Sequence, residues 1–194
     1  SLGFLVSDIS PVNELNILVE GEFDRELLIE ANKYFKVLDL NEVSIIGCSR
    51  ASNIQKWASL YTSNDLVVVG LYDSDSSGKS SFNSVTGFEK LQLTDVCTGV
   101  ETIEDLLPES VFSAGVDSWK KKEKIKKIFN AVVPRMTQIN AELSTDSTKK
   151  IEQKHLLEDC LMEEVRIEIK KDSKKFGSFE KLLNELKKKM YGTS

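Results

Sequence analysis

Histidine, cysteine and proline are scarce in this chain of 194 residues. It has one histidine, His155, and three cysteines that stand far apart without a Cys-x-x-Cys pair. A disulfide scaffold and a cysteine-rich zinc site are therefore excluded, and a histidine-based metal site or catalytic triad would depend on His155 alone. Isolated cysteines of this kind are typical of a reducing compartment, so we expect a cytoplasmic protein.

Long apolar runs are also missing. No segment approaches the roughly 20 apolar residues that a membrane-spanning helix needs, and no basic segment precedes an apolar core near the N-terminus. The sequence therefore predicts neither a membrane span nor a signal peptide. Its hydrophobic content of 40% is too high for a disordered chain and is enough for one compact domain with a small helical annex.

Charge is distributed unevenly around the net value of -5. Residues 1–118 hold 7 basic and 19 acidic side chains, whereas residues 119–194 hold 19 basic and 12 acidic ones. Two interpretations of this asymmetry stay open. The basic half is either a solvated, Lys-rich helical surface, or a phosphate-binding surface beside a carboxylate-lined metal site.

Short apolar runs alternate with helical patterns along the acidic half. We expect strands at 16–19, 43–48 and 66–72, helices at 22–35 and 53–61, and short strands near 90–93 and 96–98. The run at 66–72 is apolar throughout, which is typical of a strand buried on both faces of a parallel sheet. Strands separated by helices predict an α/β fold with a mainly parallel central sheet flanked by helices.

The basic half has a different pattern. From Ser118 onward it is helical and rich in Lys and Glu, with breaks expected near 143–147 and at Gly177. We therefore expect a sheet domain at 1–117 followed by a basic helical annex at 118–194.

Acidic side chains follow the expected strands at three places. They are Glu20 and Asp24 after the first strand, Asp73 and Asp75 after the central strand, and Glu101, Glu104 and Asp105 after the last strand. Ligands of parallel sheets bind beyond the carboxyl ends of the strands. Carboxylates gathered there repel one another unless a hard divalent cation lies among them. Because histidine is nearly absent, the pattern favours Mg²⁺ or Mn²⁺ over zinc.

Two of these clusters form motifs, Val19-Glu20-Gly21-x-x-Asp24 and, after an apolar strand, Asp73-x-Asp75-x-x-Gly78. Together they resemble the TOPRIM domain shared by type IA and type II topoisomerases, bacterial primases and small nucleases. The segment Glu101–Leu107 is most similar to the C-terminal nuclease region of the overcoming-lysogenization-defect (OLD) family and its Gabija-type relatives. The resemblance covers about residues 14 to 110, and the annex is similar in character only.

The resemblance implies a DNA endonuclease that uses two divalent cations, Mg²⁺ or Mn²⁺, to stabilise the attacking and leaving oxygens. The implied metal ligands are Glu20, Asp24, Asp73 and Asp75, with Glu101, Glu104 or Asp105 completing the second site. Among the last three, Glu104 is favoured because it lies in the best-matched segment. The implied catalytic residues are Glu20, Asp73, Asp75 and an annex lysine, for which Lys174 and Lys175 are the candidates.

Proteins of the OLD family carry an ABC-type ATPase domain before the TOPRIM domain. Ser77-Gly78-Lys79-Ser80 lacks the upstream glycine of a P-loop. The chain is therefore expected to be either the C-terminal nuclease region of a longer protein that holds the ATPase, or a stand-alone small TOPRIM protein. The implied partners are DNA, that N-terminal ATPase domain and further copies of the chain bound through other regions, without a membrane. Two alternatives stay open: another TOPRIM enzyme, such as an RNA-processing nuclease or a primase, and a non-catalytic Mg²⁺-binding regulatory domain.

Overall fold

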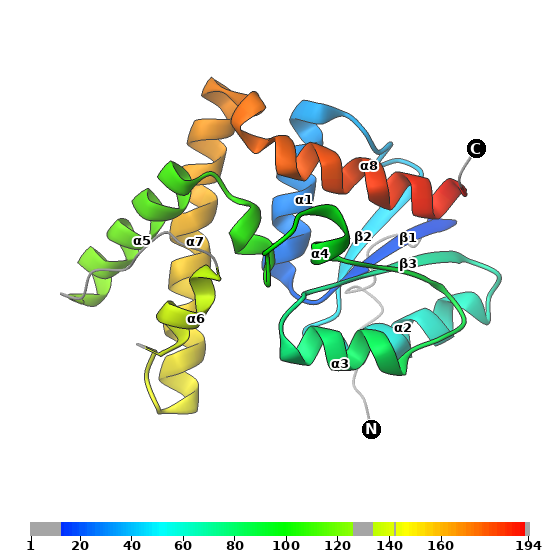
Figure 1. Ribbon diagram of the computed structural model, residues 1–194, viewed down its shortest axis with the longest axis horizontal. Coiled ribbons are helices and arrows are strands. Elements are labelled where there is room, and N and C mark those ends of the chain that lie inside the picture. The colour runs from blue at the N-terminus through cyan, green and yellow to red at the C-terminus, as the bar shows by residue number, and fades with distance from the viewer. Residues whose placement is uncertain (1–12, 126–133, 142, 193–194) are drawn as a thin grey trace.

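Residues 13–125, 134–141 and 143–192 are described by the structure, a computed structural model shown in Figure 1. The strands are β1 (Leu15–Val19), β2 (Val43–Gly47), β3 (Val67–Tyr72) and β4 (Glu89–Gln92). The helices are α1 (Glu22–Phe35), α2 (Ala51–Thr62), α3 (Ser76–Ser84), α4 (Leu93–Val96), α5 (Glu109–Glu123), α6 (Arg135–Asn140), α7 (Ser147–Lys171) and α8 (Gly177–Tyr191), with short 3-10 helices η2 (Ile103–Leu106) and η3 (Ser173–Phe176). The strands form one parallel sheet in the order β2-β1-β3-β4, which confirms the predicted α/β fold.

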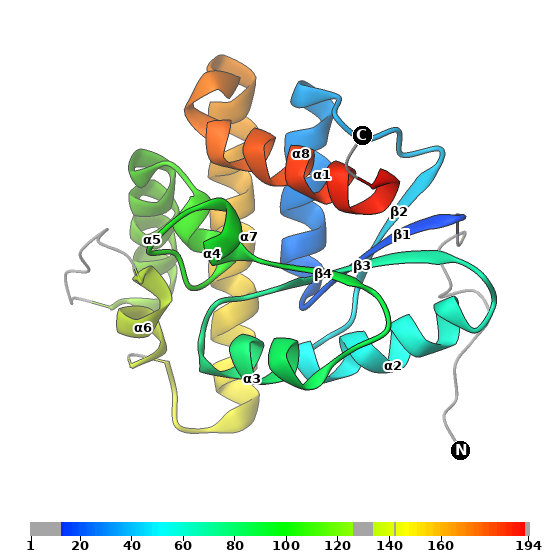
Figure 2. The same cartoon turned by 45° about the vertical axis from the view of Figure 1, so that its right-hand side comes forward.

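The two central strands are buried on both faces of the sheet. β1 is buried from Asn16 to Val19, and β3 from Val68 to Tyr72. Successive side chains point to opposite faces, so Ile17 joins the core beneath α1 and α8, whereas Leu18 joins the core beneath α2. Figures 1 and 2 show α1 and α8 on one side of the sheet and α2 and α3 on the other.

The chain reverses its direction of winding between β1 and β3. It leaves β1 through α1 toward β2 at one edge, and leaves β3 through α3 toward β4 at the other edge. Right-handed crossovers then require α1 and α3 to lie on opposite faces, as they do in Figure 1. Ligands of open α/β sheets bind at such a switch point, beyond the carboxyl ends of the strands. The ends of β1 and β3 therefore mark the expected site.

Helices α5, α6 and α7 form a group beside α1 (Figures 1 and 2). α5 and α7 pack closely, because Gly115 lies against Leu161 and Trp119 Nε1 donates a hydrogen bond to the Gln153 carbonyl at 3.1 Å. α8 leaves this group and packs on β3 and β4, and the boundary expected after residue 117 falls inside α5. Within the described part of the chain, no helix is both long and apolar enough to cross a membrane.

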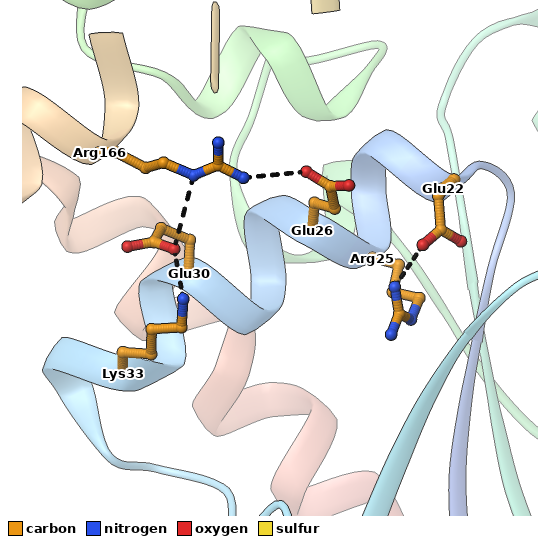
Figure 3. Close-up of polar contacts among 6 residues, drawn as sticks. All are labelled: Glu22, Arg25, Glu26, Glu30, Lys33 and Arg166. Atoms are coloured by element: carbon orange, nitrogen blue, oxygen red, sulfur yellow. Dashed lines mark hydrogen bonds and ion pairs between the residues drawn. The ribbon is translucent and has the colours of Figure 1, made fainter. Parts of the chain in front are cut away.

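A network of ion pairs joins α7 to α1 at the surface (Figure 3). The Arg166 guanidinium lies 3.2 Å from Glu26 Oε2 and 3.9 Å from Glu30 Oε2, and Lys33 Nζ lies 2.7 Å from the same Glu30 oxygen. Exposed ion pairs contribute at most about 1 kcal/mol each. The main attachment of α7 is therefore its apolar side, which is buried in the core shared with α1 and α5.

Two short helices lie where the sequence pattern predicts none. α3 lacks apolar periodicity, yet it starts where the Asp75 carboxylate accepts a hydrogen bond from the Gly78 N–H at 2.7 Å. The strand expected at 96–98 is wrong, because the turn of α4 occupies this part of the chain. There the Asp95 carboxylate accepts the Gln92 N–H at 2.9 Å. In both cases an acidic side chain satisfies a free N–H at a helix start.

The close approach of α5 to α7 generates a prediction on stability. A Cβ at Gly115 would lie 3.1 Å from the Leu161 Cα, whereas a Cβ at Gly177 would meet no atom within 4 Å. Gly115→Val should lower the free energy of unfolding by about 1–3 kcal/mol through overpacking. Gly177→Val should change it by less than about 0.5 kcal/mol. Urea denaturation measures both, and equal effects would contradict the close packing.

Candidate metal centre

A cleft of about 860 Å³ opens where β1 and β3 end. Five of the acidic residues expected in the site line it: Glu20, Asp24, Asp73, Asp75 and Glu104. The lining residues that α7 contributes are Lys154, His155, Glu158, Asp159 and Met162. The remaining expected site residues do not line the cleft: Glu101, Asp105, Lys174 and Lys175.

The end of β1 is tied to the end of β3 by a side chain. Glu20 Oε1 accepts a hydrogen bond from the Asp73 N–H at 3.0 Å. At the start of α1, Asp24 Oδ2 accepts the Gly21 N–H at 2.8 Å. Each of these carboxylates thus uses one oxygen on the backbone, which fixes its position at the sheet edge.

The segment after β3 is held by the residue between its two aspartates. Ser74 is fully buried, its Oγ lies 3.0 Å from both the Thr94 Oγ1 and the Thr94 nitrogen, and its N–H donates to the Glu101 carbonyl at 2.6 Å. Asp73 and Asp75 flank this anchor, and both line the cleft. Gly78 is required here, because a Cβ would lie 2.2 Å from the Asp73 carbonyl oxygen.

Asp105 and Glu104 of the third acidic cluster have different roles. Asp105 is structural: its Oδ2 accepts the Glu101 N–H at 2.9 Å and its Oδ1 accepts the Arg135 N–H at 2.9 Å, which docks the start of α6 on η2. Glu104 instead lines the cleft, although it is only 6% exposed. Within the described residues its carboxylate has neither a hydrogen-bond nor an ion-pair partner.

The gathered carboxylates oppose one another's ionisation. Burial and, second, the nearby charge of Glu104 raise the pKa of Asp24 to about 7, although the Gly21 hydrogen bond opposes them. Burial, followed by the charges of Asp24 and Glu104, raises the pKa of Asp73 well above its ordinary value. Burial also raises the pKa of Glu20, although the hydrogen bond from Asp73 opposes this. The folded protein therefore holds these groups at an electrostatic cost.

The donor set fits a hard divalent cation. Carboxylate oxygens are the ligands that Mg²⁺ and Mn²⁺ prefer, and a cation would remove the repulsion among Asp24, Asp73 and Glu104. Glu104, a largely buried residue that lines the cleft, adds a further carboxylate to this set. In the described part of the chain, no three Asp, Glu, His or Cys side chains surround one point closely enough to hold an ion as they stand. Cation binding therefore requires side-chain rotation.

The wall of the cleft that α7 contributes carries a lysine. Lys154 Nζ lies 3.5 Å from Glu158 Oε1. Burial lowers the pKa of Lys154, but the charges of Glu158, Glu104 and Asp24 outweigh it and raise the pKa overall. Lys154, Glu158 and Met162 recur at helical spacing, so this cleft-facing stripe is visible in the sequence. No local sequence pattern, however, predicts that this stripe faces the strand ends, which lie more than 50 residues away along the chain.

Lys174 and Lys175 lie on η3, which follows the C-terminal end of α7, whereas Lys154 lies near the N-terminal end of α7. Both are exposed, and Lys175 Nζ pairs with Glu168 Oε2 at 3.4 Å. Among the annex lysines that the structure describes, Lys154 is the one that lines the carboxylate cleft. Searches against protein-family models, curated proteins and solved structures found no match to this chain.

The raised carboxyl pKa values predict how stability depends on pH without metal. A carboxyl group whose folded pKa exceeds its unfolded value favours folding while protonated, and this contribution is lost as the pH rises. For Asp24 the loss spans pH 3.8 to about 7. Asp73→Asn removes one of the repelling charges. In EDTA it should raise the melting temperature at pH 8 by about 2–4 °C, the shift that about 1 kcal/mol produces in a chain of this size.

At pH 4 the gap between Asp73→Asn and the wild type should shrink, because the raised pKa values leave Asp24 and, in the wild type, Asp73 largely protonated. Glu163→Gln is the matched control, since Glu163 is exposed on α7 and does not line the cleft. Melting curves followed by circular dichroism measure all three proteins. A variant less stable than the wild type at pH 8 would contradict the repulsion.

Proposed function

We propose that this chain is a divalent-cation-dependent phosphodiester hydrolase that cleaves DNA, as the TOPRIM resemblance implies. One observation carries the proposal: carboxylates from three separate segments meet at the switch point of a parallel sheet, in a cleft whose other wall carries a lysine. Their mutual repulsion calls for cations, and the lysine suits a phosphate anion.

Asp73, Asp24 and Glu104 are the proposed ligands at the centre of the site, because the charges of Asp24 and Glu104 act most strongly on Asp73, and that of Glu104 acts most strongly on Asp24. Glu20 and Asp75 complete the set from the ends of β1 and β3. Cations held there would polarise the phosphoryl oxygens and lower the pKa of the attacking water. The chain's own contribution is to fix the backbone that carries these oxygens at the ends of β1 and β3, the start of α1 and η2, so that little backbone reorganisation is needed during the reaction.

Lys154 takes the role that the resemblance gives to an annex lysine. Its side chain lines the same cleft as the carboxylates and comes from α7. A lysine there stabilises the negative charge that grows on the phosphoryl oxygens in the transition state. Exposed lysines such as Lys121 and Lys122 at the end of α5 would add sequence-independent DNA affinity through phosphate neutralisation.

Cleavage of supercoiled plasmid in Mg²⁺ or Mn²⁺ tests the function. Asp73→Ala should lower the rate at least 100-fold, which corresponds to about 2.7 kcal/mol of transition-state stabilisation. The fold should persist, since the loss relieves repulsion. Glu163→Gln should cleave at the wild-type rate. A wild type that binds cations without cleaving DNA or RNA would instead support the regulatory, non-catalytic alternative.

A second test separates the lysines. Lys154→Ala should lower the single-turnover cleavage rate at least tenfold more than it lowers equilibrium DNA affinity, because its interaction strengthens in the transition state. Lys174→Ala and Lys175→Ala should cleave at rates close to the wild type, because neither side chain lines the cleft. Loss of cleavage in either of these two variants, with Lys154→Ala active, would return the catalytic role to η3.

A further inference from the structure

We propose that Arg50, in the turn between β2 and α2, binds a phosphate group of the substrate strand next to the phosphate that is cleaved. The inference rests on the proposed function, because it takes the carboxylate cleft to be the site of phosphodiester cleavage. It adds a phosphate subsite beside the metal centre. The substrate of that site is then a polynucleotide strand, since an isolated phosphodiester has no neighbouring phosphate.

The charge of the cleft shows why a nucleic acid strand needs such a subsite. Nine carboxylate side chains line the cleft, whereas the lysine and arginine side chains in its lining, among the described residues, are Lys154 and Arg50. Cations at the metal centre would offset the carboxylates that bind them, but Glu22 and Glu26 lie outside that set. A guanidinium group in the lining suits a phosphate, because its planar fork of N–H donors matches two phosphate oxygens.

The guanidinium of Arg50 is available to a ligand. Arg50 is exposed, and within the described residues its guanidinium has neither a hydrogen-bond nor an ion-pair partner. Glu22 lies beside the same turn, because a Cβ at Gly47 would lie 2.9 Å from Glu22 Oε2. Glu22 pairs with Arg25 instead (Figure 3), and Arg25 Nε also donates to the Ile45 carbonyl at 3.1 Å. The nearest acidic neighbour of the turn thus leaves Arg50 unpaired.

The backbone that carries Arg50 is fixed in a strained turn. Ser49 has a φ of 68°, in the left-handed region that residues other than glycine seldom adopt. The Cys48 N–H donates to the Val19 carbonyl at 2.9 Å, and the Asn53 side-chain amide donates to the Cys48 carbonyl at 3.0 Å. Residues held in such a conformation by their surroundings cluster at ligand-binding sites. Here the turn places Ser49 and Arg50 in the lining of the cleft.

The order of the strands places Arg50 beside the metal centre. β2 pairs with β1 and β1 pairs with β3, so Arg50, Glu20 and Asp73 follow three successive strand ends along one edge of the sheet. Neighbouring strands are about 4.8 Å apart, so the ends of β2 and β3 are about 10 Å apart. A strand whose cleaved phosphate lies at cations on Asp73 would therefore present a neighbouring phosphate to Arg50.

A subsite of this kind acts on binding more than on the reaction rate. The neighbouring phosphate keeps its charge throughout the reaction, so Arg50 would stabilise the bound substrate and the transition state equally. Loss of Arg50 should weaken binding and leave the rate for bound substrate almost unchanged. Lys154, for which we propose a role in the transition state, should show the opposite behaviour.

Single-turnover cleavage of supercoiled plasmid in Mn²⁺, at a series of protein concentrations and between about 50 and 200 mM salt, tests the subsite. Arg50→Gln should raise the half-saturating protein concentration about tenfold, the effect of one charge-assisted hydrogen bond. The maximal rate should fall by less than about twofold. The slope of log affinity against log salt should become shallower by about one, as expected for one lost phosphate contact.

Two further variants accompany Arg50→Gln. Lys36→Gln is the matched control, because Lys36 is exposed at the end of α1 opposite to the cleft, and it should equal the wild type in half-saturating concentration, maximal rate and salt slope. Arg50→Lys keeps the charge and loses the planar fork, so it should retain the wild-type salt slope with only part of the affinity.

Melting curves followed by circular dichroism establish that Arg50→Gln folds as the wild type does. An unchanged half-saturating concentration, an unchanged salt slope, or a maximal rate that falls as far as the affinity would overturn the subsite and leave the proposed function standing. A wild type that cleaves neither DNA nor RNA would overturn the proposed function, and this inference with it.

Discussion

Repulsion among carboxylates at one edge of a parallel sheet is the constraint on which this structure depends. Asp24, Asp73 and Glu104 come from three segments, and the parallel strands bring all three to the same end. The repulsion persists because the backbone around them is fixed: Glu20 binds the Asp73 N–H, and the Gly78 N–H binds Asp75. A site with this cost is maintained by the rest of the fold, which makes it a functional candidate rather than a stabilising feature.

The apolar layers on both faces of the sheet offset that cost. Burying one large aliphatic side chain contributes about 1.5–3 kcal/mol, more than an exposed ion pair contributes. On α7, the fully buried Leu157 and Leu161 therefore decide where the helix lies, and Arg166 adds only orientation. The same placement carries Lys154 to the cleft. The buried side of α7 thus determines which side chains its other side presents to the cleft.

The pattern of apolar residues along the sequence predicted those strands and helices whose burial it specifies. The strands ending at Val19 and Tyr72 and the acidic residues that follow them lie where the sequence predicts, because continuous apolar runs specify buried parallel strands. α3 escaped prediction because its serine-rich sequence has no apolar period, and the Asp75 cap specifies its start. The separate roles of Glu104 and Asp105 also escaped, since they depend on the docking of Arg135 from a distant segment.

The annex shows why its lysines are the hardest part of the site to find from sequence. Lysines are spread along the whole segment, and only tertiary packing distinguishes them. Lys187 binds the Val37 carbonyl and Lys189 pairs with Glu89, so both hold α8 in place. Lys175 pairs with Glu168 near the end of α7, whereas Lys154 lines the cleft. The site therefore combines two kinds of positioning. Glu20 and Asp73 lie at strand ends, where small displacements are costly. The positively charged ammonium group of Lys154, by contrast, is carried on a flexible side chain from a packed helix.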